Sequence, residues 1–388
     1  MNILVISTLF GGGYGAGYSA YKECLELSKK GHKLIIVHCE PNIHKYDDSV
    51  SKYYYVKFHK LPLFNIWLLK RDLEKTISKI LVENKIDLVY VHSLEMGLIN
   101  SDIIGGKKII YFVRSTTRGV EKNKPIEYWK DSIRRFFITP LLIYLEIRGL
   151  NWARIIIVKS DLMKRELIDL YGIAPPKIKI VSGGFDKEDF PKISKKGLQR
   201  SMIILKKLKK RDKLILFAGR IVPVKGLIYL VDALPNILKS YNIKLFVLGS
   251  GLFSNYDKLI HRKIEELNLK DRVIFLGEVP QEEVYKYMAV ADLCVVPSVY
   301  EPFGMVAIQA ANYNLPLIIT RSVGAADLLK RYSLLRIVRP HSSKDISEAS
   351  LDLLSRNRIK STRIADFKSW KEISNKLEKI FIKELKRN

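Results

Sequence analysis

The sequence predicts an α/β protein with two doubly wound parallel sheets. Short runs of apolar, β-branched residues alternate with segments of helical period along the whole chain, which is the pattern of repeated β-α units. The 388 residues fit two domains of ordinary size better than one. A Gly183-Gly184 pair, followed by Pro191, has the chemistry of a linker and divides the runs into two sets.

Each set contains enough strands for one doubly wound sheet. We place the domain limits at 1–183 and 184–366, and we assign 367–388, where the residues have helical period, to a separate C-terminal helix. The strands predicted before the linker are Asn2–Ser7, Lys33–Cys39, Asp87–His92, Lys108–Val113, Arg154–Val158 and Ile178–Val181. Those predicted after it are Leu214–Ala218, Lys244–Leu248, Arg272–Leu276, Asp292–Pro297 and Leu315–Thr320.

Cysteine usage and the N-terminal residues indicate a cytoplasmic protein. Cys24, Cys39 and Cys294 are scattered without metal-ligand spacing, so we interpret them as reduced core residues. The chain opens with a buried strand instead of a basic leader, and we expect no signal peptide. No uncharged apolar run is long enough to span a bilayer.

The formal net charge of +27 favours an anionic partner. The basic residues are spread along the chain, and no zinc-finger spacing, homeodomain-like helix or RNA-binding aromatic motif is present, so we expect no nucleic-acid partner. A solvated lysine-rich surface and a peripheral contact with the inner face of the cell membrane both fit this charge.

Two segments bear on the membrane question. Lys195–Lys213 is lysine-dense, and we interpret it as an amphipathic helix that leads into the second domain. Ile126–Leu150 places aromatic residues such as Trp129 beside arginines at helical spacing. That pattern suits a membrane interface and equally suits a buried helix with a basic flank.

The most informative residues follow the strand Asp292–Pro297. Glu301 and Gly304 lie in the next loop, and an alanine-rich helix then begins. In a doubly wound sheet this loop lies at the carboxyl end of a strand, where ligands bind. The free N–H groups and the dipole of the helix N-terminus suit a diphosphate, and Gly304 lets the backbone approach it closely.

A second loop of the same kind follows the strand Leu214–Ala218. It begins with Gly219 and carries two cations, Arg220 and Lys225, that suit one pyrophosphate. Fixed cations stabilise the negative charge that a leaving nucleoside diphosphate gains. Because the chain has no Asp-x-Asp pair and no His/Cys cluster, we expect neither a metal nor another cofactor.

These motifs occur in the order and spacing of family 4 of the GT-B glycosyltransferases, which the chain resembles over its whole length. The Gly-rich opening loop, Gly31-His32, Gly183-Gly184-Phe185-Asp186 and Trp370 are similar to that family as well. The motifs that carry the resemblance are Gly219-Arg220, Lys225-Gly226, Val247-Leu248-Gly249-Ser250-Gly251, Val273-Ile274-Phe275-Leu276-Gly277 and Glu301-Pro302-Phe303-Gly304.

The resemblance implies two Rossmann-like domains that face a cleft, with the acceptor on the N-terminal domain and the donor nucleotide on the C-terminal one. It also implies a last helix that crosses back to the first domain, and metal-independent transfer with retention at the anomeric carbon. By residue, it implies that Arg220 and Lys225 grip the diphosphate and that Glu301 binds sugar hydroxyls. The residues that it places around the phosphate, sugar and base are Gly219, Val279, Glu282, Phe303, Gly304, Met305 and Val306.

The sequence departs from the family pattern at two positions. Gln309 stands where a second Glu usually binds the ribose, and a Gln amide keeps hydrogen bonding there without charge assistance. Arg114 stands where the family often has a His, and Arg cannot act as a base at neutral pH. Arg114 and Arg118 suit the phosphate of an acceptor, and His92 is another residue that could contact substrate.

The loop after the first strand satisfies part of a dinucleotide fingerprint. The resemblance instead makes this loop a lid over the donor phosphate and the acceptor. Gly15 is the residue that we expect nearest to the phosphate, with Gly13 next.

We expect a hexosyltransferase that uses a nucleotide sugar such as UDP- or GDP-hexose and a glycan or lipid-linked acceptor. Two alternatives remain open. One is a non-catalytic protein that binds a nucleotide sugar or glycan, suggested by Arg114 and Gln309. The other is a nucleotide-sugar epimerase, which needs carboxylates that the sequence does not place clearly.

Overall fold

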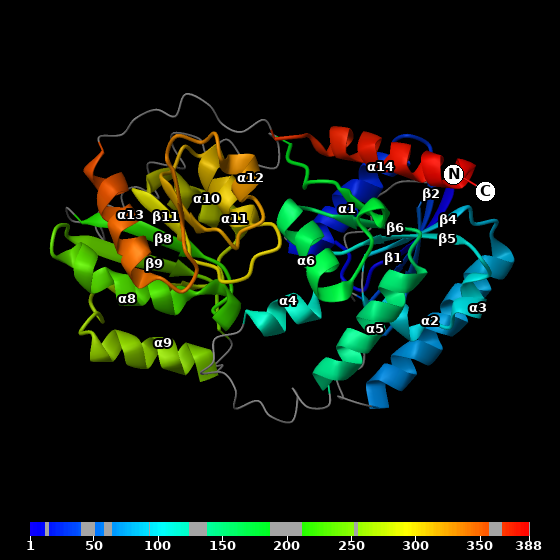
Figure 1. Cartoon of the computed structure of the whole chain (residues 1–388), viewed down its shortest axis with the longest axis horizontal. Helices are drawn as coiled ribbons and strands as arrows, with labels where there is room; N and C mark the ends of the chain where they lie inside the picture. The colour runs from blue at the N-terminus through cyan, green and yellow to red at the C-terminus, as the bar shows by residue number, and fades with distance from the viewer. Residues whose placement is uncertain are drawn as a thin grey trace. The chain divides into compact units, whose positions relative to one another are not determined.

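The computed structural model describes residues 1–11, 15–39, 51–57, 64–92, 94–123, 138–186, 212–251, 255–356 and 367–387. The chain divides into two compact units, each built around one parallel sheet (Figure 1). The first unit comprises Met1–Glu121, Trp129–Asp186 and Lys368–Asn388. The second comprises Lys122–Tyr128 and Lys187–Phe367.

The sheet of the first unit has seven parallel strands in the order β3-β2-β1-β4-β5-β6-β7. The order reverses where β1 pairs with β4 after pairing with β2, which makes this the switch point of the sheet. The strands are β1 Asn2–Ile6, β2 Lys33–His38, β3 Ser51–Tyr55, β4 Leu88–Val91, β5 Lys108–Phe112, β6 Ile155–Val158 and β7 Ile178–Ile180.

Helices cover both faces of this sheet, because its central strands are apolar on both sides. Apolar side chains of α2, α3, α5 and α6 form the core on one face, and those of α1 and α14 form it on the other. The helices are α1 Gly15–Ser28, α2 Phe64–Glu83, η1 Leu94–Leu98, α3 Ser101–Ile104, α4 Thr117–Lys122, α5 Thr139–Trp152, α6 Asp161–Tyr171, η4 Pro175–Lys177 and α14 Trp370–Lys386.

The last helix, α14, belongs to the first unit although it follows the second in sequence (Figure 1). A capping box between Ser369 and Glu372 fixes its start. The Trp370 ring is buried against Gly184, where a Cβ would lie 2.6 Å from the indole. This contact accounts for the glycine before the linker and for the Trp at the start of the helix.

The sheet of the second unit has six parallel strands in the order β10-β9-β8-β11-β12-β13. Its order reverses at β8, which pairs with β9 on one side and β11 on the other. The strands are β8 Lys213–Ala218, β9 Ile243–Leu248, β10 Val273–Gly277, β11 Leu293–Val296, β12 Leu317–Thr320 and β13 Leu335–Val338.

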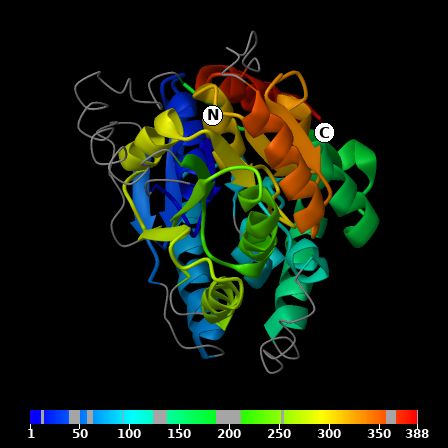
Figure 2. The same cartoon turned by 90° about the vertical axis from the view of Figure 1, so that its left-hand side faces the viewer.

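Helices α8, α9 and α13 pack their apolar side chains against one face of this sheet. Helix α13, orange in Figure 2, lies against α8 on this face. Helices α10, α11 and α12 gather on the other side (Figure 1). The helices are η6 Pro223–Lys225, α8 Leu227–Leu238, α9 Asn255–Glu266, α10 Gln281–Val290, α11 Met305–Asn312, α12 Ala326–Leu329 and α13 Ser343–Ser355.

The predicted fold class is confirmed, and every predicted strand is present. Two further strands, β3 and β13, were not predicted, and each lies at the edge of its sheet. Lys195–Lys213 lies outside the described residues except for its last two positions, and so does Ile126–Leu150 before Ile138. Within the described ranges, no helix has both the length and the apolar character needed to cross a bilayer.

Candidate functional site

The carboxyl edge of the second sheet brings together the residues predicted to bind the donor. The loops after β8 and β11 lie side by side there, because these strands are neighbours at the switch point. The amides of Val299 and Tyr300 both donate to the carbonyl of Val224, at 2.9 and 3.3 Å, and so tie the two loops together.

Two glycines shape the loop after β8. Gly219 has a φ of +149°, and its amide donates to the carbonyl of Leu248 at 2.8 Å. Gly226 has a φ of +67°, and a Cβ there would lie 2.1 Å from the carbonyl oxygen of Pro297. Only glycine therefore lets this loop pack against the end of β11. The Arg220 side chain is exposed, and no ion pair or side-chain hydrogen bond joins it to the rest of the described chain.

Lys225 and Glu301 form an ion pair across the two loops, with about a fifth of each side chain exposed. The backbone fixes Glu301 on both sides, because its amide donates to Ser322 at 3.1 Å and its carbonyl accepts from Gly324 at 2.8 Å. The carboxylate is thus held on a rigid loop beside a cation. This arrangement offers an acceptor and a donor of hydrogen bonds at one point of the sheet edge.

Gly304 lies immediately before α11 with a φ of +101°, and a Cβ there would lie 2.5 Å from a Val323 methyl carbon. The first amides of α11, those of Met305 and Val306, have no acceptor within the helix. Such a terminus is a site for an anion. The neighbouring Phe303 is buried, and its carbonyl accepts from the Ala325 amide at 2.6 Å.

Gln309 and Val279 differ in solvent exposure. Gln309 is only 7% exposed, and its Nε2 lies 3.5 Å from the Tyr285 hydroxyl of α10. Val279 is half-buried after β10, and Glu282 is exposed on the first turn of α10. The role of Gln309 in ribose binding and that of Val279 in base binding stay predictions.

The predicted residues of the first unit, Gly15, His92 and Arg114, lie at the carboxyl edge of its sheet. Gly15 begins α1 with a φ of +79°, and its carbonyl accepts from the Ser19 hydroxyl at 3.1 Å. Lys159, which follows β6 and is buried, donates to the same hydroxyl at 2.9 Å. Lys159 was not predicted from the sequence.

Arg114 makes a bidentate ion pair with Glu23 of α1, with nitrogen–oxygen distances of 3.2 and 3.0 Å. Glu23 is fully buried and also accepts from the Tyr90 hydroxyl at 2.9 Å. Sequence reasoning missed Glu23, although a signal was present. Ala20, Cys24 and Leu27 mark an apolar helix face, and Glu23 lies on it.

His92 completes this buried network. Its Nδ1 lies 2.7 Å from Nη2 of Arg114, and its ring is 8% exposed. Burial, with the cations of Arg114 and Lys159, lowers the pKa of His92 well below its usual range. Burial and the Glu23 carboxylate raise the pKa of Tyr90. Both side chains are therefore neutral at physiological pH.

Arg118 lies in a different environment from Arg114. Its guanidinium stacks 5.0 Å from the Tyr171 ring centre and donates to the carbonyl of Leu170. Beneath it, the Tyr171 hydroxyl donates to Glu146, whose carboxylate also accepts from the Thr117 amide at 3.0 Å. Burial raises the pKa of Glu146 to about 7. Sequence reasoning missed this buried acid as well.

Among the described residues, no group of three or more His, Cys, Asp or Glu side chains could hold a metal ion. The edge of the second sheet presents instead the Lys225–Glu301 ion pair, the exposed Arg220 and the first amides of α11.

Known proteins match this chain over most of its length. The model of Glycosyltransferase Family 4 matches residues 14–189, and that of Glycosyl transferases group 1 matches residues 203–369. A curated relative, the phosphatidylinositol N-acetylglucosaminyltransferase GPI3 subunit of Saccharomyces cerevisiae, is 25% identical over 327 residues, 80% of this chain and 65% of the relative. The matched parts span less than two thirds of the length of this relative and of the first curated relative.

Solved structures share the fold. Sucrose-phosphate synthase from Thermosynechococcus elongatus has a TM-score of 0.78 at 17% identity, and all of both chains is covered. Anabaena HepE in complex with UDP-glucose has a TM-score of 0.72 at 17% identity, with 99% of this chain and 100% of that one covered. Since the two family models together span most of the sequence and the fold agrees, this chain belongs to family 4 of the GT-B glycosyltransferases, the glycosyl transferases group 1.

Proposed function

We propose that this chain transfers a hexose from a nucleotide diphosphate sugar to a glycan or lipid-linked acceptor, with retention and without a metal. The observation that carries the proposal is the Lys225–Glu301 pair at the switch point of the second sheet, beside the first turn of α11. Ligands of open α/β sheets bind at such points. The two side chains match the two halves of a nucleotide sugar, because one suits a phosphate and the other suits sugar hydroxyls.

The chemistry requires stabilisation of a leaving group. When the bond between the anomeric carbon and the phosphate oxygen breaks, the nucleoside diphosphate keeps the electron pair. The acceptor oxygen then bonds to the carbon and releases its proton to solvent. Lys225, the exposed Arg220 and the α11 amides are donors aimed at that developing charge, and such preorganised donors typically supply the largest part of catalysis.

A uridine or guanosine diphosphate hexose is the donor that we propose. Support comes from Anabaena HepE, which shares the fold and holds UDP-glucose. Retention and independence from metal rest on the family resemblance.

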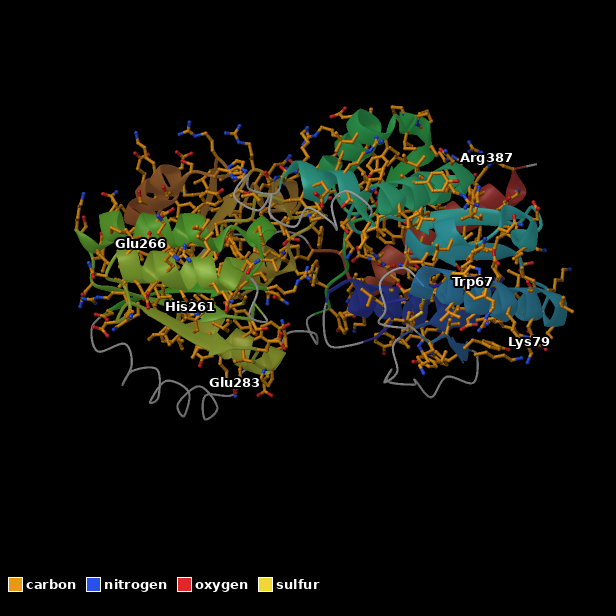
Figure 3. All side chains as sticks on the ribbon, turned by 90° about the horizontal axis from the view of Figure 1, so that it is seen from below. Trp67, Lys79, His261, Glu266, Glu283 and Arg387 are labelled. Carbon is orange, nitrogen blue, oxygen red and sulfur yellow. The ribbon has the colours of Figure 1, made fainter. Side chains whose placement is uncertain are left out.

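A lipid-linked acceptor at the inner membrane face is the finer part of the proposal. Trp67 of α2 and Tyr144 of α5 are each 56% exposed, and both helices cover the same face of the first sheet. Arg71 and Arg148 lie 5.7 and 5.8 Å from the centres of these two rings. Figure 3 labels Trp67 and Lys79 along α2. Exposed aromatics with neighbouring cations suit an anionic lipid surface, and the yeast relative is named for a phosphatidylinositol substrate.

The first test is thermal-shift binding of UDP, GDP, ADP and their hexose conjugates, with and without EDTA. We expect one nucleotide to raise the midpoint in EDTA, and its conjugate to be hydrolysed slowly. Arg220→Ala should abolish both effects. Arg262→Ala, which removes an exposed cation of α9, is the matched control and should change neither.

Each outcome separates the candidate functions. Binding with hydrolysis supports a transferase. Binding without hydrolysis or transfer indicates a non-catalytic binder, and a changed sugar stereocentre indicates an epimerase. Normal turnover in Arg220→Ala would contradict the assigned diphosphate site.

A further inference from the structure

His92 occupies the switch point of the first sheet. It follows β4 directly, and its amide donates to the carbonyl of Ile6 in β1 at 2.9 Å. The reversal of strand order between β1 and β4 makes this the switch point, and open α/β sheets bind ligands at such points. His92 thus has the same topological place in the first unit that the Glu301 loop has in the second.

The contact with Arg114 settles which ring nitrogen carries the proton. A guanidinium has only donors, so at 2.7 Å the Nδ1 of His92 must accept, and the hydrogen of the neutral ring is on Nε2. The surrounding charged and titratable groups are Glu23 of α1, Tyr90 of β4, Arg114 after β5 and Lys159 after β6. Burial lowers the pKa of the ring, and the two cations lower it further because they oppose another positive charge, so the ring stays neutral.

The ion pair with Glu23 holds the guanidinium in place. Arg114 uses both terminal nitrogens on the Glu23 carboxylate, and it lies 3.9 Å from the centre of the Phe112 ring. Glu23 is itself fixed by the Tyr90 hydroxyl. The positive charge of Arg114 is therefore already balanced by Glu23 inside the unit. From this position, the role of Arg114 is to orient the ring of His92.

The Nε2–H group of His92 is a buried donor without a hydrogen-bond partner in the described part of the chain. Buried donors are almost always satisfied, and an unsatisfied one at the switch point of a sheet calls for an explanation. The Nε atom of Arg114 is also buried and without such a partner. An oxygen atom of a bound substrate would satisfy the His92 donor, because a lone pair of that oxygen can accept the hydrogen bond from Nε2–H.

We propose that His92 is a neutral hydrogen-bond donor to an oxygen of the substrate, and that Arg114 and Glu23 are positioning residues that fix its tautomer. This inference rests on the proposed transferase function for the identity of the substrate, which presents a hydroxyl or phosphate oxygen. His92 is then not a general base, because Nε2 already carries its proton. The oxygen belongs either to the donor sugar or to the acceptor, and the experiments distinguish these two sources.

The tautomer is measured without any substrate. In the full chain labelled with ¹⁵N-histidine, with His92→Gln used to assign the signal, we expect the Nε2–H tautomer of His92 from about pH 5.5 to 8.5. Glu23→Gln should change the nitrogen shifts of His92. An Nδ1–H tautomer, or an imidazolium that forms within this range, would overturn the proposal.

The substrate contact is measured by hydrolysis of UDP-glucose, alone and with vesicles made from the total lipid of the source cells. His92→Phe keeps a flat ring but removes the donor, and we expect kcat/KM to fall about tenfold, the usual effect of one lost hydrogen bond. His92→Gln, which restores a donor, should recover most of that loss. A fall without vesicles assigns the oxygen to the donor sugar, and a fall only with vesicles assigns it to the acceptor.

Two results would count against this inference in different ways. If His92→Phe folds with an unchanged melting temperature and turns over within twofold of the wild type in both arms, His92 has only a structural role. If the wild type shows the expected tautomer but neither binds nor hydrolyses any nucleotide sugar, the proposed function fails, and the substrate contact fails with it.

Discussion

Lys225 and Glu301 pair across the loops that follow β8 and β11, so the cation and the carboxylate at the switch point neutralise each other in the free protein. Binding of a nucleotide sugar would then exchange one partner for another. Lys225 would turn to the diphosphate, and Glu301 would turn to the sugar. This exchange predicts that the two halves of the donor depend on different residues.

Glu301→Gln should separate sugar recognition from nucleotide recognition. The change keeps the side-chain size and frees Lys225, so we expect affinity for UDP to stay within about threefold or to rise. Turnover of UDP-glucose should fall by about 10- to 100-fold, because a charge-assisted hydrogen bond to the sugar is weakened. Calorimetric titration measures the affinity for UDP, and release of UDP from UDP-glucose measures the turnover. Glu283→Gln on α10 is the control, and an equal loss for both ligands would argue against a sugar contact.

Gly226 should tolerate a side chain far less than Gly277 does. Both have nearly the same positive φ, +67° and +69°, but a Cβ meets the Pro297 carbonyl at 2.1 Å only at Gly226. Gly277→Ala should therefore cost about 1–2 kcal/mol, the usual strain of this conformation. Gly226→Ala should cost clearly more and weaken UDP binding, because Lys225 is adjacent. Melting temperatures report the difference at roughly 2–4 °C per kcal/mol, and equal shifts would contradict the packing argument.

Removing one partner of the buried Arg114–Glu23 pair should lower the free energy of unfolding strongly, because the other partner is left uncompensated. Glu23→Gln leaves the guanidinium without its counter-ion, and we expect a loss of about 3–5 kcal/mol in the free energy of unfolding. The double variant Glu23→Gln/Arg114→Met should lose less than the sum of the two single changes. Urea unfolding of all four proteins gives the coupling, and simple additivity would show that the pair does not interact.

The sequence predicted the strands of both sheets except β3 and β13, each of which lies at one edge of its sheet. Central strands such as Ile3–Ile6 are apolar on both faces, because helices cover both sides of a parallel sheet. The strand β3, by contrast, reads Ser-Lys-Tyr-Tyr-Tyr, and β13 carries Arg336 and an exposed Ile337. An edge strand pairs on one side only and is partly solvated, so its composition resembles that of a loop.

The donor-side residues could be predicted because they are local in sequence. Glycine turns and the end of a strand mark the loop of Arg220 and Lys225 and that of Glu301. Glu23, Arg114 and His92 come from three separate elements, 91 positions apart between the two ion-pair partners. Only the tertiary fold joins them, so sequence reasoning named Arg114 and His92 without Glu23, the ion-pair partner of Arg114.

Stability should depend on pH through Glu146. Burial raises its pKa to about 7 from 4.5, so the folded state holds this proton more tightly than the unfolded state does. Stability is then lost as the pH rises between these two values, by up to about 3 kcal/mol. Glu146→Gln cannot ionise, so the free energy of unfolding of the wild type relative to this variant should fall as the pH rises from about 4.5 to about 7. Glu83→Gln, at a half-exposed position of α2, is the control. A difference that does not change with pH would show that Glu146 stays ionised.

Trp67 and Tyr144 should contribute to membrane binding if α2 and α5 face the lipid. Each ring is more than half exposed and has an arginine within 6 Å of its centre, so insertion at an interface would bury apolar area beside a cation. We expect Trp67→Ala/Tyr144→Ala to weaken sedimentation with vesicles containing anionic lipid by about tenfold or more, and added salt to weaken the wild type as well. Tyr55→Ala removes a ring of similar exposure from the edge strand β3, and it should leave binding unchanged. Equal losses in both proteins would indicate general adhesion of a basic protein, and no binding by the wild type would favour a soluble acceptor.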